Sequence, residues 1–188
     1  MKLKNIVKVM EGKFITRYDL VYETIDEKEK IYEMISRNKN IETLDELQNH
    51  TPDAVVLILH NKEGDKVLLN KEFRMAVGKW VYNFPAGLID EGEVPTESAA
   101  RELKEETGLD LISIDDVLFN SFSAVGFSNE VNMCVIGTAD GTFQQSTSTF
   151  EEIEAGWYTK EEVLELMREN EFAARTQAYC YAWAKFGK

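Results

Sequence analysis

Residues 87–109 read Gly-Leu-Ile-Asp-Glu-Gly-Glu-Val-Pro-Thr-Glu-Ser-Ala-Ala-Arg-Glu-Leu-Lys-Glu-Glu-Thr-Gly-Leu. Pro95 suits the first position of a helix and Gly108 suits the position just after its end, so we predict a helix over 95–107. An inward apolar stripe is expected at three- and four-residue spacing, formed by Ala99, Ala100, Leu103 and Thr107. The stretch therefore predicts a helix packed on a core by one side.

The opposite side of this helix carries three carboxylates. Glu102, Glu105 and Glu106 lie three and four residues apart, where like charges repel and weaken a helix. One interpretation is an ordinary solvated acidic face. The other is a divalent-metal site built from hard oxygen ligands, because bound cations would remove the repulsion. Upstream, Gly87 is expected to allow a backbone conformation that turns the carbonyl of Ala86 to the same metals.

A structural ion pair is expected at the start of this helix. Arg101 is expected to face a different side from Glu102, while Glu93 lies close to the first turn. We predict a Glu93–Arg101 pair that holds the preceding loop on the helix.

The remainder of the chain alternates strand and helix patterns. Residues 38–52 are polar and predict a linker or short helix. Strands are expected at 14–23 and 30–37 as a hairpin, and then at 54–60, 66–73, 80–85, 116–122, 129–138 and 152–158. Further helices are expected at 159–170 and 173–186. Strands on both sides of a central helix predict an α+β or mixed α/β sandwich.

Composition limits the classes of function. The net charge is −13, which argues against a nucleic-acid partner because such proteins need a basic face. No apolar run is long enough for a membrane span, and the N-terminus lacks a secretory signal. Cys134 and Cys180 do not make a disulfide framework, so a cytoplasmic location is expected. His50 and His60 lack partners at zinc spacing, so no metal is assigned to them.

The spacing within residues 87–109 matches the Nudix box. It has Gly, five residues, Glu, seven residues, Arg-Glu, an aliphatic residue, one residue, Glu-Glu, one residue, Gly and an aliphatic residue. At average residue usage, about one random start position in 10⁸ would match, which outweighs the solvated-face interpretation. The resemblance implies a Nudix-type α/β/α sandwich with a mixed central sheet, and hydrolysis of a nucleoside diphosphate linked to another moiety. It also implies that Mg²⁺ or Mn²⁺ is held by Glu102, Glu105, Glu106 and the carbonyl of Ala86.

Other segments resemble the ADP-ribose pyrophosphatase branch of that family. Residues 1–50 look like its extra N-terminal β-hairpin, which implies a homodimer, and 51–188 like its hydrolase domain. Glu72-Phe73-Arg74 is similar to the motif whose arginine, here Arg74, contacts the substrate phosphates. Glu130 lies in a Gly-Phe-Ser-Asn-Glu segment that resembles the loop after the box, and it is a candidate for substrate binding. Phe14, with Tyr18, is a candidate for the adenine pocket. The resemblance implies conversion of ADP-ribose to AMP and ribose 5-phosphate.

Several alternatives stay open on this sequence. The branch has a proline where this chain has Ala124-Val125, and usually a glutamate at the position of Asn83. The substrate is therefore ADP-ribose, another nucleotide sugar or a dinucleotide. A non-catalytic nucleotide-sensing domain is the alternative from another class. The general base is Glu105, or else Glu151 or Glu152, which follow the polar stretch 140–149.

Overall fold

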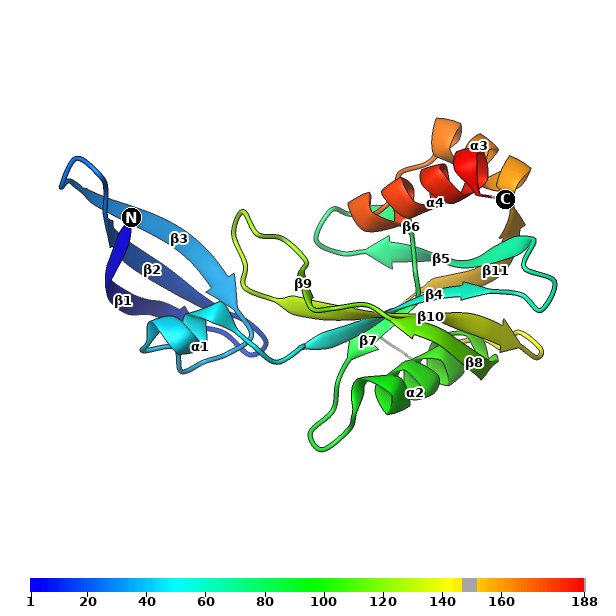
Figure 1. The fold of residues 1–188 in the computed structure, drawn as a ribbon, viewed down its shortest axis with the longest axis horizontal. Coiled ribbons are helices and arrows are strands. Elements are labelled where there is room, and N and C mark those ends of the chain that lie inside the picture. Colours follow the sequence, from blue (N-terminus) through cyan, green and yellow to red (C-terminus); the bar gives the residue numbers. More distant parts are fainter. Residues whose placement is uncertain (147–151, 188) are drawn as a thin grey trace. The chain divides into compact units, whose positions relative to one another are not determined.

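The computed structural model describes residues 1–146 and 152–187, so the candidate base Glu151 lies outside the described residues. The chain divides into two units (Figure 1). Unit 1 contains Met1–Ala54 and Phe119–Met133, and unit 2 contains Val55–Leu118 and Cys134–Lys188. Among the described residues, no helix combines the length and the apolar character needed to cross a membrane.

Unit 1 is built on a three-stranded antiparallel sheet. Its strands β1 (Lys2–Glu11), β2 (Thr16–Glu23) and β3 (Glu29–Ser36) follow one another in space as they do in the chain. Alternate residues of β2, including Tyr18 and Leu20, are buried with Met34 of β3. The short helix α1 (Leu44–Gln48) starts with a capping box between Thr43 and Glu46 and adds Leu47 to the same core.

Residues 119–133 belong to unit 1 because they bond to its sheet. The backbone amide of Ile35 donates to the carbonyl of Phe127 at 2.8 Å, and the hydroxyl of Tyr32 donates to the carbonyl of Gly126. Here β9 (Ser121–Phe122) pairs with the first residues of β10 (Val131–Asp140). A segment from within the predicted range 51–188 therefore packs with residues 1–54.

Unit 2 holds the larger sheet. Its strand order is β11-β5-β4-β10-β8, with β6 beside β5 and β7 beside β4. The bounds of these strands are β4 (Ala54–His60), β5 (Lys66–Arg74), β6 (Lys79–Asn83), β7 (Ala86–Leu88), β8 (Asp110–Val117) and β11 (Ile153–Thr159). The helices are α2 (Pro95–Thr107), α3 (Lys160–Glu169) and α4 (Ala174–Phe186).

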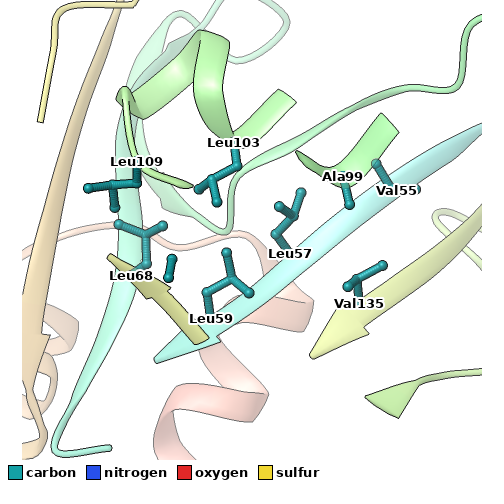
Figure 2. Packing of buried hydrophobic residues seen from close by; sticks show 9 residues of the cluster. Val55, Leu57, Leu59, Leu68, Ala99, Leu103, Leu109 and Val135 are labelled. Carbon is teal, nitrogen blue, oxygen red and sulfur yellow. The ribbon is translucent and has the colours of Figure 1, made fainter. Parts of the chain in front are cut away.

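Residues Ala54 to Leu59 of strand β4 are all apolar because both faces of the strand are buried there. Val55, Leu57 and Leu59 point to one face, where they pack with Ala99 and Leu103 of α2 (Figure 2). The alternate residues of the strand, Val56 and Ile58, pack in a second cluster with residues of α3 and α4, such as Val163 and Cys180. Figure 1 shows α2 on one side of this sheet and α3 with α4 on the other. The predicted α/β/α sandwich is confirmed.

Helix α2 has the predicted bounds, Pro95–Thr107. The Glu97 carboxylate accepts from the backbone amide of Val94 at 3.3 Å, and Gly108 ends the helix with a φ of 79°. One residue of the predicted stripe is wrong, since Ala100 is exposed. Its place inside is taken by Ser98, whose hydroxyl donates to the Glu93 carboxylate at 2.6 Å and so satisfies its buried oxygen.

Two further differences concern strands. The predicted hairpin over 14–37 corresponds to β2 and β3, but β1 was missed because its side chains are mostly exposed and show no apolar alternation. The strand expected at 116–122 is wrong. Residues 110–117 form β8, and only Ser121 and Phe122 form β9, because pairing with different parts of β10 divides the segment.

Candidate active site

The carboxylate of Glu102 occupies the space where a side chain of residue 87 would stand. A Cβ atom built on Gly87 would lie 1.9 Å from Cδ of Glu102 and 2.2 Å from each carboxylate oxygen. Glycine is therefore required by space. Gly87 lies in β7 and does not have a positive φ, so a left-handed conformation is not the reason for glycine here, and the expected turn of the Ala86 carbonyl toward the metals stays a prediction.

Arg101 connects the helix to the preceding loop. Its Nε and Nη2 donate to the two oxygens of Glu93 at 2.9 and 2.8 Å, in the bidentate geometry that guanidinium favours. Nη2 also donates to the carbonyl of Leu88 at 3.0 Å. The expectation that Arg101 faces away from Glu102 is wrong, since Nη1 donates to Oε1 of Glu102 at 2.7 Å. The long arginine side chain bends across the helix surface and reaches both carboxylates.

These bonds give the loop a strong electrostatic anchor. Hydrogen bonds from Arg101 and from the Ser98 hydroxyl lower the pKa of Glu93 to about 2. The same bonds to Glu93 raise the pKa of Arg101, so both groups stay charged at any ordinary pH. Arg101 also lies 3.7 Å from Asp90. The loop between β7 and α2 is thereby held on the acidic side of the helix.

Glu106 is the most buried of the three helix carboxylates, with 8% of its surface exposed. Its Oε2 accepts a hydrogen bond from Nδ2 of Asn70 on β5 at 2.8 Å. Asn70 is almost fully buried, and its Oδ1 has no hydrogen-bond partner among residues 1–146 and 152–187. Asn70 was missed from the sequence, although a polar residue after Val67-Leu68-Leu69 in a buried strand is a recognisable signal.

The residue types at this site are those that a hard divalent cation prefers, although their side chains do not converge on one point among the described residues. Glu102 and Glu106 supply carboxylate oxygens on one side of α2, the Gly87 backbone lies against Glu102, and the buried Oδ1 of Asn70 lacks a donor. In the part of the chain that the structure describes, no three His, Cys, Asp or Glu side chains converge into a metal-binding group. Arg101 draws Glu102 toward the loop, while Asn70 holds Glu106 at the sheet.

A second polar network lies on neighbouring strands of unit 2. Nδ2 of Asn83 on β6 donates to Oε1 of the buried Glu72 on β5 at 2.9 Å. Oδ1 of Asn83 accepts from the hydroxyl of Thr176 at 2.9 Å. Nη1 of Arg74 lies 3.4 Å from Oε2 of Glu72, and its side chain is 54% exposed. An amide at residue 83 therefore suits a carboxylate at residue 72, whereas a glutamate there would repel it.

The two described candidates for the general base both reach solvent. Glu105 on α2 has a half-exposed side chain, with Oε2 3.5 Å from Nη1 of Arg101. Glu152 is exposed, and its backbone carbonyl accepts from the amide of Phe73 at 3.0 Å, beside the Glu72–Ile153 pair of the sheet. Gln144 packs against Gly108, where a side chain would collide with it, and its backbone amide donates to the carbonyl of Thr107 at 2.9 Å. Residue 144 is therefore held at the end of α2.

The remaining candidates lie in unit 1 or in the core. Phe14 is 68% exposed beside Lys13, and Glu130 accepts from Nε of Arg37 at 2.6 Å. Tyr18 is fully buried and donates to the carbonyl of Asn38, so it cannot line an open adenine pocket. In unit 2 the ring of Tyr82 is buried and stacked on Phe172, so it packs in the core.

The fold is an α/β/α sandwich, and its helix α2 carries three glutamates beside Gly87 of β7. These features together are typical of one protein family. The NUDIX domain model matches residues 50–182, and the chain belongs to the Nudix family. It is 42% identical over 87 residues to an ADP-ribose pyrophosphatase of Saccharomyces cerevisiae, covering 44% of this chain and 36% of that protein. It is 27% identical over 130 residues to an ADP-ribose pyrophosphatase of Bacillus subtilis, covering 68% and 69% of the two chains.

A solved structure supports the fold. The crystal structure of an ADP compounds hydrolase aligns with a TM-score of 0.70 at 17% identity, covering 100% of this chain and 98% of the other. At this identity the likeness concerns the fold alone. The chain spans less than half the length of two of the curated relatives, 36% of the yeast protein and 46% of a nudix hydrolase of Caenorhabditis elegans.

Proposed function

We propose that this protein hydrolyses the pyrophosphate bond of ADP-ribose with Mg²⁺ and releases AMP and ribose 5-phosphate. The observation that carries the proposal is the Glu102 carboxylate seated against the Gly87 backbone under Arg101. A catalytic carboxylate in that position can bind a cation together with the neighbouring carbonyl of Ala86. The names of the yeast and Bacillus relatives support the choice of substrate.

The chain's own groups divide the chemistry between them. Glu102, Glu105, Glu106 and the carbonyl of Ala86 would hold Mg²⁺, or Mn²⁺ in its place. When bound, the cations neutralise the pyrophosphate and lower the pKa of the attacking water. A water oxygen attacks one phosphorus, the bond from that phosphorus to the bridging oxygen breaks, and the water's proton passes to a carboxylate. Arg74, exposed at the end of β5, contacts the substrate phosphates.

The proton acceptor is Glu105 or Glu152, with Glu151 as the neighbour outside the described residues. Glu105→Gln and Glu152→Gln separate the described candidates. Loss of the true base lowers kcat at saturating metal, and Glu152→Gln should leave the Mn²⁺ affinity unchanged because Glu152 is not among the proposed metal ligands. A Glu152→Gln enzyme with normal kcat at every pH would leave Glu105 or Glu151 as the base.

Another nucleotide sugar or a dinucleotide is the second candidate substrate. The observation that favours it is the Glu72–Asn83–Thr176 network. In this network Asn83 stands where the ADP-ribose pyrophosphatase branch usually has a glutamate. Nucleotide sensing without catalysis is the alternative from another class. Turnover of any of these substrates argues against sensing, and relative kcat/KM for ADP-ribose, ADP-glucose and NAD⁺ ranks the substrates.

The decisive experiment is incubation of the purified protein with ADP-ribose and Mg²⁺, followed by chromatography of AMP. We expect AMP release that a chelator abolishes. Glu106→Gln should lower kcat beyond the roughly 10- to 100-fold typical of residues that only support a metal ligand. The matched control is Glu91→Gln, which removes one acidic charge from the exposed loop of the same segment and should retain activity.

Two results would contradict the proposal. Full activity of Glu106→Gln would exclude this carboxylate as a metal ligand. Absence of AMP with ADP-ribose, together with turnover of another nucleoside diphosphate, would transfer the assignment to that substrate. The homodimer and the cytoplasmic location are part of the same proposal and need their own tests.

A further inference from the structure

Asn70 is a polar residue in an otherwise apolar part of β5. Val67, Leu68 and Leu69, which precede it, are fully buried, and Asn70 itself is 1% exposed. An amide buried in a sheet costs free energy unless hydrogen bonds replace its bonds to water. Packing alone would favour an aliphatic side chain at this position, so the amide must have polar partners.

The two ends of the Asn70 amide differ in their contacts. Nδ2 donates to Oε2 of Glu106 at 2.8 Å, and this contact fixes the orientation of the amide, since a carboxylate accepts only from the nitrogen. Oδ1 is buried and has no hydrogen-bond partner within residues 1–146 and 152–187. Asn83, on the neighbouring strand, shows the ordinary arrangement, because it donates to Glu72 and accepts from Thr176.

We infer that Asn70 is a positioning residue of the metal site, with Nδ2 orienting the Glu106 carboxylate and Oδ1 accepting from water that hydrates the bound cation. The inference rests on the proposed function. Mg²⁺ usually keeps several water ligands, and such waters are the class of donor that Oδ1 lacks. Carboxylates that bind metals are themselves held by hydrogen bonds from surrounding residues.

The test measures metal affinity in the absence of substrate. Mn²⁺ is titrated into metal-free protein, and free Mn²⁺ is followed by electron paramagnetic resonance. Asn70→Leu keeps the approximate size of the side chain and removes both polar ends. We expect its Mn²⁺ affinity to fall by about 10- to 100-fold, and Glu106→Gln to fall at least as far. The control is Asn132→Leu, another buried strand asparagine, which donates to the hydroxyl of Ser123 and should bind Mn²⁺ like the wild type.

A second readout separates positioning from general damage to the fold. At low Mg²⁺ the Asn70→Leu enzyme should be slow, and raising Mg²⁺ should restore most of kcat. A defect of folding would not respond to the metal in this way. Circular dichroism checks that each variant is folded, and Asn70→Ser, which is too short to reach Glu106, replaces Asn70→Leu if the leucine variant does not fold.

The possible outcomes are distinct. If wild type and Glu106→Gln bind Mn²⁺ equally, the proposed metal site fails. If Glu106→Gln loses affinity while both Asn70 variants match the wild type, the metal site stands and the inference about Asn70 is overturned. Equal losses for Asn70→Leu and Asn132→Leu would also overturn it, because the effect would then follow any buried asparagine.

Discussion

Gly87 illustrates how one residue determines the site through the space that it leaves. The Glu102 carboxylate occupies the space that a side chain at residue 87 would fill. Each carboxylate oxygen lies 2.2 Å from the position that a Cβ atom would take. Real Cβ atoms do not approach other atoms so closely, so any larger residue would push Glu102 aside. Glycine is therefore needed at residue 87 to leave space for the carboxylate. It is not needed for the backbone conformation of β7, which other residues also adopt.

Gly87→Ala should reduce metal affinity more than it reduces stability. We expect overpacking to cost about 1–3 kcal/mol of unfolding free energy, and displacement of Glu102 to weaken Mn²⁺ binding by about tenfold or more. The measurements are Mn²⁺ titration and urea unfolding. Gly92→Ala is the control: its φ of 89° makes alanine strained by about 1–2 kcal/mol, but nothing lies within 4 Å of the added Cβ. Unchanged Mn²⁺ affinity in Gly87→Ala would contradict this role.

At the scale of elements, the loop before α2 depends on an ion pair that titrates in acid. The pKa of Glu93 is about 2 in the folded chain, against an ordinary value of 4.5. A carboxyl whose pKa is depressed by folding stabilises the fold above its unfolded pKa and loses this contribution as the pH falls toward the folded pKa. The loss therefore lies between about pH 4.5 and pH 2.

Glu93→Gln should lower the melting temperature at pH 6 and have a smaller effect as the pH falls through this window. The physical reason is that the wild type loses the charged pair with Arg101 in acid, whereas the variant has already lost it. Melting curves from pH 6 to pH 3 make the comparison. Glu91→Gln, in the same loop, should follow the wild type. A difference between wild type and Glu93→Gln that stays constant with pH would argue against the ion pair.

The contact between α4 and the sheet should respond to pH in a different range. His60 at the end of β4 has Nδ1 3.0 Å from the carbonyl of Lys66 and Nε2 2.9 Å from the hydroxyl of Tyr179. Burial lowers the pKa of His60 below its ordinary value of 6.5, because the charged ring is poorly solvated there. A depressed histidine pKa means that stability is complete above about pH 6.5 and falls as the pH drops below it.

Unfolding free energy should therefore decrease between pH 7.5 and pH 5.5, and His60→Asn should reduce that decrease. Urea unfolding at several pH values measures it. The chain has two histidines, and His50→Asn is the matched control because His50 is exposed beside Asp45. If His50→Asn flattened the pH dependence and His60→Asn did not, the burial of His60 would not be its cause.

At the scale of the whole molecule, unit 1 carries apolar side chains on its surface. Val7, Val9 and Met10 of β1 are 41%, 43% and 64% exposed, and Phe14 and Ile15 after this strand are 68% and 46% exposed. Exposed apolar groups of this extent favour association. The proposed homodimer would bury them against a second copy.

The protein should elute as a particle of twice the 21.5 kDa chain mass in size-exclusion chromatography with light scattering at micromolar concentration. Val9→Lys places a charge on the β1 surface and should shift the protein toward the monomer, because burial of an unpaired charge is unfavourable. Lys2→Ala is the control on the same strand. A wild type that stays monomeric at micromolar concentration would exclude the dimer.

Much of the fold was predictable because its signals are local. Pro95 and Gly108 mark the two ends of α2, and the continuous apolar run 54–59 marks a strand buried on both faces. The strand β1 was not predictable from such signals. Its side chains are mostly exposed and do not alternate between apolar and polar residues, and its pairing with β2 is a tertiary contact. The exposed Ala100 was misassigned since alanine suits either side of a helix.

By itself, the sequence determined the helix, the spacing of its glutamates and the membership of a family, because these depend on short-range periodicity and on residue identity. Only the tertiary structure decided that Asn70 meets Glu106, 36 residues away, and that Asn83 joins Glu72 to Thr176. It also decided that Arg101 reaches Glu102 as well as Glu93. The physical reason is that such contacts depend on strand register and on how a helix lies on its sheet, and neither is encoded in any one local pattern.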